Sequence, residues 1–170
     1  MIKGLYYLTK LQICNLFGIN EARFSRDLKQ KKRATAMLAT FALLGGMLVF
    51  YAVGLSVALV EFGLGEIVPL YLALLSTVMI FGLTILKAGA LFGVKADEKL
   101  AVLPVSNPVV VASRFLSLYI VNFLFAFVIT VSGGVTYGVM ANQGIWFYFS
   151  ICLSSVFIPL MPMSAALAIG

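Results

Sequence analysis

The chain has 170 residues, of which 62% are hydrophobic and 11% are charged, and its formal net charge is +6 at neutral pH. Soluble domains carry about 25% charged and about 45–50% apolar residues, so this composition excludes a water-soluble protein and indicates an integral membrane protein. The chain has no histidine, and Cys14 lies in a polar leader whereas Cys152 lies in an apolar run. We therefore expect no disulfide, no metal or cofactor site, no catalytic residues and no enzymatic activity.

The first 35 residues form a leader that mixes aliphatic and aromatic side chains with lysines. Its leucines lie loosely on one side of a helix, and we predict a helix on the membrane surface from about Lys3 to Phe17. A basic stretch follows and ends at Arg33. Because this stretch directly precedes an apolar run, we interpret "KQKKR" as a topology anchor rather than as a nucleic-acid-binding signal.

Four apolar runs follow the leader, and each is long enough to cross a bilayer core of about 30 Å as a helix. They lack the alternation of a barrel strand. The expected fold is an all-α integral membrane protein, a polytopic helical bundle with a transmembrane domain at 36–170. We predict its transmembrane helices at about 36–60, 67–91, 113–138 and 144–168.

The distribution of basic residues predicts the orientation of these helices. All 12 basic residues either precede the first span or lie at or between the second and third spans. Basic residues favour the cytoplasmic side, so the amino terminus and the loop 92–112 should be cytoplasmic. The connections at 61–66 and 142–143 contain no basic residue and should lie outside.

The end of the sequence raises a further expectation. No charged residue follows Arg114, and the last residue, Gly170, comes directly after a predicted span. A membrane protein usually closes with a polar, basic tail that anchors its last helix. We therefore expect the chain to be the N-terminal part of a larger bundle, completed by further transmembrane helices or by a second copy.

The predicted spans contain neutral polar groups but no central ionisable residue, which disfavours a transporter driven by protons or sodium. Asn122 either forms a hydrogen bond across helices or faces a substrate path, and we favour the first interpretation. Small residues four apart at Gly89–Gly93 and Gly134–Gly138 are typical of closely packed helices. Pro159 and Pro162 interrupt the fourth run, where they form either a gating hinge or a static kink, and we favour the kink.

The loop between the second and third spans, "VKADEKLAVLPVSNPVVVASR", has mixed charge and a mostly helical pattern. Pro104 should end a short helix, and Pro108 should begin the next one with Ser106 or Asn107 as its cap. We interpret 95–108 as a docking element for a soluble partner, the alternative being an inner turn with a structural role only. The expected partner contacts are Asp97, Glu98, Lys99, Leu100, Leu103 and Pro104.

The segment Leu86–Tyr119 resembles the inner loop of bacterial ABC exporter permeases of the type-2 class. In those proteins a Leu-x-x-Leu-Pro-Val/Ile-Ser segment precedes a helix that starts with Ser-Arg-Phe. The leader "LTKLQICNLFGIN" and the turn "GLGEIVPLYLALLS" are similar as well. The resemblance implies a multi-pass plasma-membrane subunit that contacts a separate ATP-binding subunit through 95–108. Permeases of that class have more spanning helices than the four predicted here, which agrees with the expected continuation.

The expected function is therefore that of the transmembrane permease subunit of an ATP-driven exporter in a bacterial plasma membrane. The chain has no Gly-x-x-x-x-Gly-Lys-Ser/Thr motif, so ATP should be hydrolysed by the partner. The alternative is a membrane anchor or assembly subunit that recruits a cytoplasmic partner but transports nothing. We expect the lipid bilayer as a further partner and no nucleic acid, and the helices do not indicate which substrate is moved.

Overall fold

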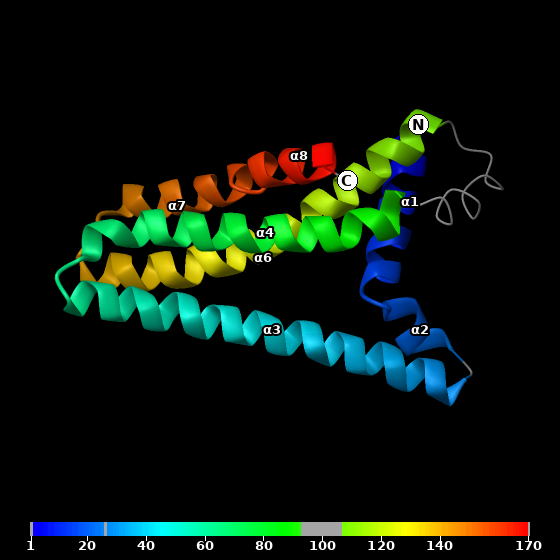
Figure 1. The fold of residues 1–170 in the computed structure, drawn as a ribbon, viewed down its shortest axis with the longest axis horizontal. Coiled ribbons are helices and arrows are strands. Elements are labelled where there is room, and N and C mark those ends of the chain that lie inside the picture. The colour runs from blue at the N-terminus through cyan, green and yellow to red at the C-terminus, as the bar shows by residue number, and fades with distance from the viewer. Residues whose placement is uncertain (1, 26, 93–106, 170) are drawn as a thin grey trace. The chain divides into compact units, whose positions relative to one another are not determined.

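The computed structural model describes residues 2–25, 27–92 and 107–169 (Figure 1). These residues form helices and short connections, with no strand among them, which confirms the predicted all-α fold. The helices are α1 (Ile2–Leu16), α2 (Ile19–Phe24), α3 (Leu28–Glu61), α4 (Val68–Phe92), α6 (Asn107–Met140), α7 (Ile145–Phe157) and α8 (Leu160–Ile169), with the 3-10 helix η1 (Gly65–Ile67) before α4.

Four segments are long and apolar enough to cross a membrane, and they give the chain the architecture of a multi-pass membrane protein. The segments are Leu28–Glu61, Gly65–Ile85, Pro108–Met140 and Ile145–Ala165. In the third segment 44% of the most apolar stretch is buried, against 17% in the first and in the fourth. The segment in α6 is therefore the most buried of the four, and the other three expose most of their most apolar stretch.

The first long helix begins earlier than the expected span at 36–60. A carboxylate oxygen of Asp27, Oδ1, accepts a hydrogen bond from the backbone N–H of Lys29 at 3.0 Å, and the Asp27 carbonyl accepts one from Lys31 at 3.0 Å. A side-chain cap of this kind stabilises a helix by about 1 kcal/mol. No glycine or proline lies between Leu28 and Leu44, so the helix runs through the basic stretch without a break.

Two connections reverse the chain through residues with a positive φ angle. Gly63, with φ 75°, follows α3, and Asn142, with φ 49°, follows α6. Each is accompanied by a backbone hydrogen bond that closes the end of its helix, from Leu64 to Leu59 at 2.8 Å and from Gln143 to Gly138 at 2.9 Å. Glycine and asparagine adopt this conformation with less strain than other residues, which explains why the helices end here.

The chain forms two compact units, and α3, α4 and α6 each contribute residues to both. Unit 1 comprises Met1–Leu44 and Lys87–Val121, and unit 2 comprises Gly45–Leu86 and Asn122–Gly170. All 12 basic residues of the sequence belong to unit 1, whereas Glu61 and Glu66 are the only charged residues in the sequence of unit 2. The charge asymmetry along the sequence therefore coincides with the division into units.

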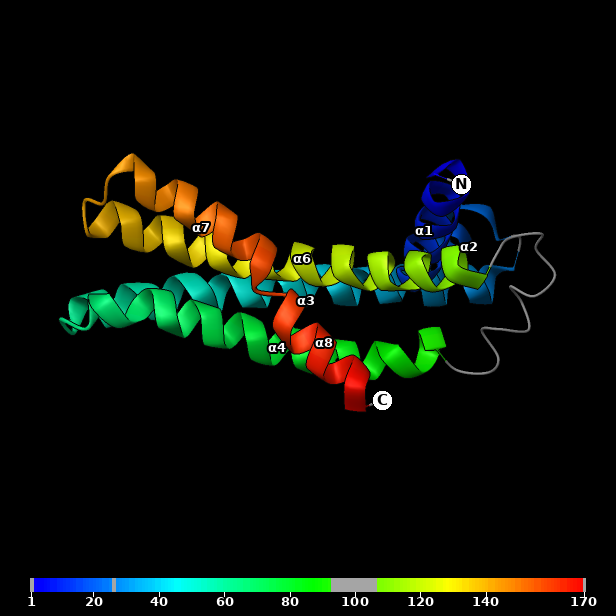
Figure 2. The same ribbon diagram turned by 90° about the horizontal axis from the view of Figure 1, so that it is seen from above.

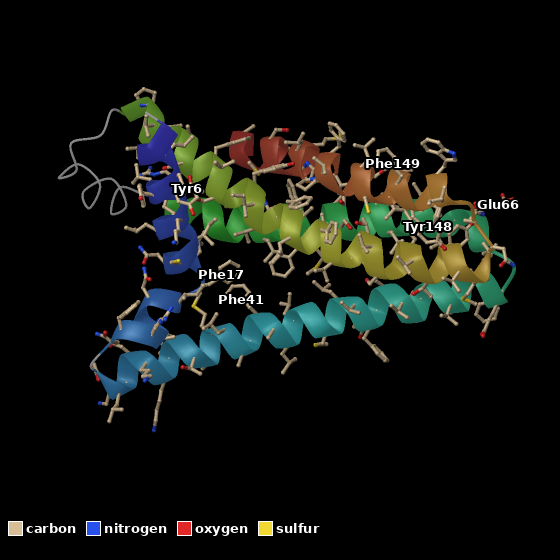
Figure 3. The ribbon with its side chains drawn as sticks, turned by 180° about the vertical axis from the view of Figure 1, so that it is seen from behind. Tyr6, Phe17, Phe41, Glu66, Tyr148 and Phe149 are labelled. Carbon is tan, nitrogen blue, oxygen red and sulfur yellow. The ribbon has the colours of Figure 1, made fainter. Side chains whose placement is uncertain are left out.

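In unit 1 the helix α1 crosses the first part of α6, as Figures 1 and 2 show. Tyr6 and Tyr7 on α1 are exposed, whereas Leu8 and Thr9 are buried. The leader also packs on the start of α3 through Phe17, whose ring meets the edge of a second aromatic ring, Phe41, with centroids 5.2 Å apart (Figure 3). The predicted surface helix thus exists as a helix, and it is attached to the bundle at two places.

Candidate functional site

The residues predicted to contact a partner lie outside the described part of the chain. This applies to the whole predicted set, which consists of Asp97, Glu98, Lys99, Leu100, Leu103 and Pro104. The structure describes α4 up to Phe92 and α6 from Asn107, so the segment 93–106 connects these two helices. Pro108 lies in the first turn of α6, where its missing N–H costs no hydrogen bond.

A buried polar contact joins α1 to the first part of α6 in unit 1. The amide Nε2 of Gln12 donates a hydrogen bond to Ser113 Oγ at 3.0 Å, and Ser117 Oγ donates to Gln12 Oε1 at 2.9 Å. All three side chains are buried. The sequence did not predict this contact, although two serines four residues apart lie on one face of a helix. The contact holds the leader helix α1 against the N-terminal part of the spanning helix α6.

A second interhelical hydrogen bond lies in unit 2. Asn122 Nδ2 on α6 donates to Thr84 Oγ1 on α4 at 2.8 Å, and both side chains are fully buried. The Thr84 hydroxyl in turn donates to the carbonyl of Ile80 at 2.7 Å. This geometry confirms that Asn122 forms a hydrogen bond across helices.

A cavity of about 320 Å³ lies between α4, α6 and α7 in unit 2. None of the described residues that line it is charged, and its polar side chains are the hydroxyl-bearing Thr130, Tyr137, Ser150 and Ser154. Two of these hydroxyls bond to carbonyls of their own helices, Thr130 to Ala126 at 2.7 Å and Ser150 to Trp146 at 2.9 Å. The lining of the cavity therefore favours an uncharged, largely apolar ligand. Its lining consists of Val68, Pro69, Leu72, Ala73, Thr130, Gly134, Tyr137, Phe147, Ser150, Ile151, Ser154 and Ile158.

The glycines of α6 in unit 2 lie where other helices approach closely. A Cβ atom at Gly134 would collide with Ile151 of α7, and one at Gly138 would lie 2.9 Å from the ring of Tyr148. The predicted close packing at Gly134–Gly138 is therefore confirmed. Of the other predicted pair, Gly93 lies outside the described residues.

The fourth apolar run is interrupted at the first of its prolines. The helix α7 ends at Phe157 and α8 begins at Leu160, so Pro159 lies in the short turn between them (Figure 2). Pro159 has no backbone N–H to continue the helical ladder, and the hydrogen bonding resumes with Met163, which donates to the Pro159 carbonyl at 3.2 Å. Both Pro159 and Pro162 are buried. The sequence predicted a kink within one helix at 144–168, and the structure divides this run into α7 and α8. The choice between a gating hinge and the favoured static kink stays a prediction.

No protein-family model, no curated protein and no solved structure matches the chain. The resemblance of Leu86–Tyr119 to exporter permeases therefore stays an interpretation of the sequence.

Proposed function

We propose that the chain is the transmembrane permease subunit of an ATP-driven exporter in a bacterial plasma membrane. The observation that carries this proposal is the distribution of charge, with all 12 basic residues in unit 1. Because basic segments stay in the cytoplasm, the amino terminus and the connection between α4 and α6 are cytoplasmic, and the connections at Gly63 and Asn142 are external. A soluble ATPase can then reach the segment 93–106.

Two features of unit 2 support a transport role over passive anchoring. The cavity between α4, α6 and α7 has the volume of a small-molecule site and no charged lining among the described residues. One wall of the cavity comes from α7, which ends at the turn that contains Pro159. A fixed break at this turn sets the direction of α7 and with it the shape of the cavity wall. The uncharged lining supports an uncharged, apolar substrate.

The role of the ATPase partner in this proposal is mechanical. ATP binding and hydrolysis in the partner move the segment 95–108, and this movement reaches the membrane through α4 and α6, to which the segment is joined. A charged contact at the rim of a docking interface, the role proposed for Lys99, contributes only about 0–1 kcal/mol. An aliphatic side chain that the partner would bury on docking, the role proposed for Leu103, contributes roughly 2 kcal/mol or more.

The proposal is tested by photo-crosslinking from Ala101 in the complex with the ATPase encoded nearest to this chain. A crosslinker at Gly63, on the opposite connection, is the matched control. We expect the ATPase in the product from position 101 only. Leu103→Asp should abolish substrate-stimulated ATP hydrolysis, whereas Lys99→Ala should have a mild effect.

Two outcomes would contradict the proposal. If no ATPase is crosslinked from Ala101 and Leu103→Asp is fully active, the segment is an ordinary inner turn. If the ATPase is crosslinked but vesicles that contain both proteins transport nothing with ATP, the chain is a recruiting anchor.

A further inference from the structure

A groove of about 330 Å³ lies between α1 and the first part of α6, within unit 1. The α1 residues that line it recur at intervals of three and four, so they lie on one face of that helix. The two α6 residues, Leu116 and Ile120, are four apart and belong to the membrane-spanning segment Pro108–Met140. The complete lining consists of Tyr6, Thr9, Lys10, Ile13, Cys14, Leu116 and Ile120.

The groove combines one cationic side chain with apolar walls. Lys10 is exposed, and it is the only charged side chain among the described residues that line the groove. The sequence of α1 contains no acidic residue that would neutralise it. Leu116 and Ile120 supply aliphatic surface on the spanning helix, and Tyr6, 61% exposed, supplies an aromatic ring (Figure 3). An ammonium beside such a surface matches a molecule with an anionic head and a hydrocarbon chain.

One hydroxyl in the groove wall has an unused hydrogen-bonding capacity. Thr9 is 5% exposed, and its Oγ1 has no hydrogen-bond partner among the described residues. A buried hydroxyl without a partner is destabilising, and such groups often mark the place of a ligand or water. A rotation of about 120° about χ1 places Oγ1 in another staggered position, where an oxygen atom of a bound headgroup would accept its hydrogen bond.

We propose that this groove binds one anionic phospholipid, with the phosphate at Lys10 and an acyl chain against Leu116 and Ile120. The site lies where a leader helix crosses the start of a spanning helix, so lipid is the amphipathic molecule that surrounds it. A free phosphate would leave the apolar walls without a contact. The proposal goes beyond the transport function and does not depend on an ATPase.

Tryptophan fluorescence can test the proposal, because Trp146 is the only native tryptophan. The full chain with Trp146→Phe and a reporter at the groove, Tyr6→Trp, is placed in phosphatidylcholine vesicles that contain increasing fractions of dibrominated phosphatidylglycerol. We expect stronger quenching than by dibrominated phosphatidylcholine at the same fraction. Lys10→Gln should weaken the apparent affinity about fivefold, the effect of one basic residue near an anionic surface. Lys29→Gln, which removes the same charge outside the groove, is the matched control.

Two further measurements do not depend on the Tyr6→Trp reporter, so they remain informative if that substitution disturbs folding. Ile120→Trp places the reporter on the other wall of the groove. In a chain with the native groove and Cys152→Ala, phosphatidylglycerol should slow the reaction of Cys14 with a maleimide, and Thr9→Val should weaken this protection roughly threefold. Equal quenching by the two brominated lipids, equal effects of Lys10→Gln and Lys29→Gln, or no protection of Cys14 would each overturn the proposal.

Discussion

Gln12 and Ser113 are 101 residues apart in the sequence, and a hydrogen bond of 3.0 Å from Gln12 Nε2 to Ser113 Oγ joins them. Because both side chains are buried, the bond attaches the leader helix α1 directly to α6. The leader helix, which carries Lys3 and Lys10, is therefore held close to the start of the spanning helix whose apolar stretch is the most buried. This attachment makes the leader part of the folded unit rather than a separate tail.

Removing the Gln12 side chain should loosen α1. In Gln12→Ala the two serines keep bonds within α6, from Ser113 Oγ to Val110 at 2.7 Å and from Ser117 Oγ to Ser113 at 2.7 Å, so no hydroxyl loses its last partner. We expect a loss of about 1–2 kcal/mol in the free energy of unfolding. Faster hydrogen exchange of α1 amides should accompany it. Asn15→Ala removes an exposed amide on the same helix, whose Oδ1 accepts a long hydrogen bond of 3.4 Å from Asn20 Nδ2, and it should change neither appreciably. Equal exchange in both variants would contradict this account.

Two glycines in unit 2 should respond differently to the same substitution. A Cβ atom at Gly133 would collide with Leu72 and would lie 3.0 Å from Ser56 Oγ and 3.1 Å from the Ala52 carbonyl. At Gly54 no described atom lies within 4 Å of that position. We expect Gly133→Ala to destabilise the bundle by about 1–3 kcal/mol through overpacking, and Gly54→Ala to be neutral or slightly stabilising. Thermal unfolding of the two variants in the same detergent measures the difference, and similar midpoints would contradict the packing at Gly133.

The orientation is tested by labelling single cysteines in a chain without Cys14 and Cys152. We expect cysteines at Lys29 and Lys99 to react with an impermeant maleimide only in inverted vesicles. Cysteines at Gly63 and Asn142 should react in intact cells. The physical reason is that the basic residues remain on the cytoplasmic side. Labelling of position 99 from outside intact cells would show that the chain has the opposite orientation, and it would rule out the proposed contact with a cytoplasmic ATPase.

The double substitution of Pro159 and Pro162 by alanine restores two backbone N–H groups to the fourth spanning segment. We expect α7 and α8 to fuse into one helix, visible as a longer distance between spin labels at Phe149 and Ala165. On the static-kink interpretation that we favour, transport and assembly are unchanged. Lower transport with intact assembly would instead identify a working hinge, and an unchanged distance would show that the surrounding helices impose the break.

The sequence by itself determined the class of the fold. A composition with 62% hydrophobic and 11% charged residues is incompatible with a soluble core, and runs of about 20 apolar residues need a helix to satisfy their backbone in lipid. The interruption at Pro159 was also predictable, because proline cannot donate the hydrogen bond that a helix requires. These features depend only on neighbouring residues in the chain.

Only the tertiary structure decided which apolar faces pack and which remain exposed. In a spanning helix both the lipid-facing and the packed faces are apolar, so periodicity does not separate them. Gly133 and Gly54 have the same side chain, yet only Gly133 lies against other helices. The cap at Asp27 extends α3 beyond its apolar stretch, which composition does not indicate. The bond from Gln12 to Ser113 depends on the path of all the residues between them, because a contact between distant residues forms only when the intervening helices bring them together.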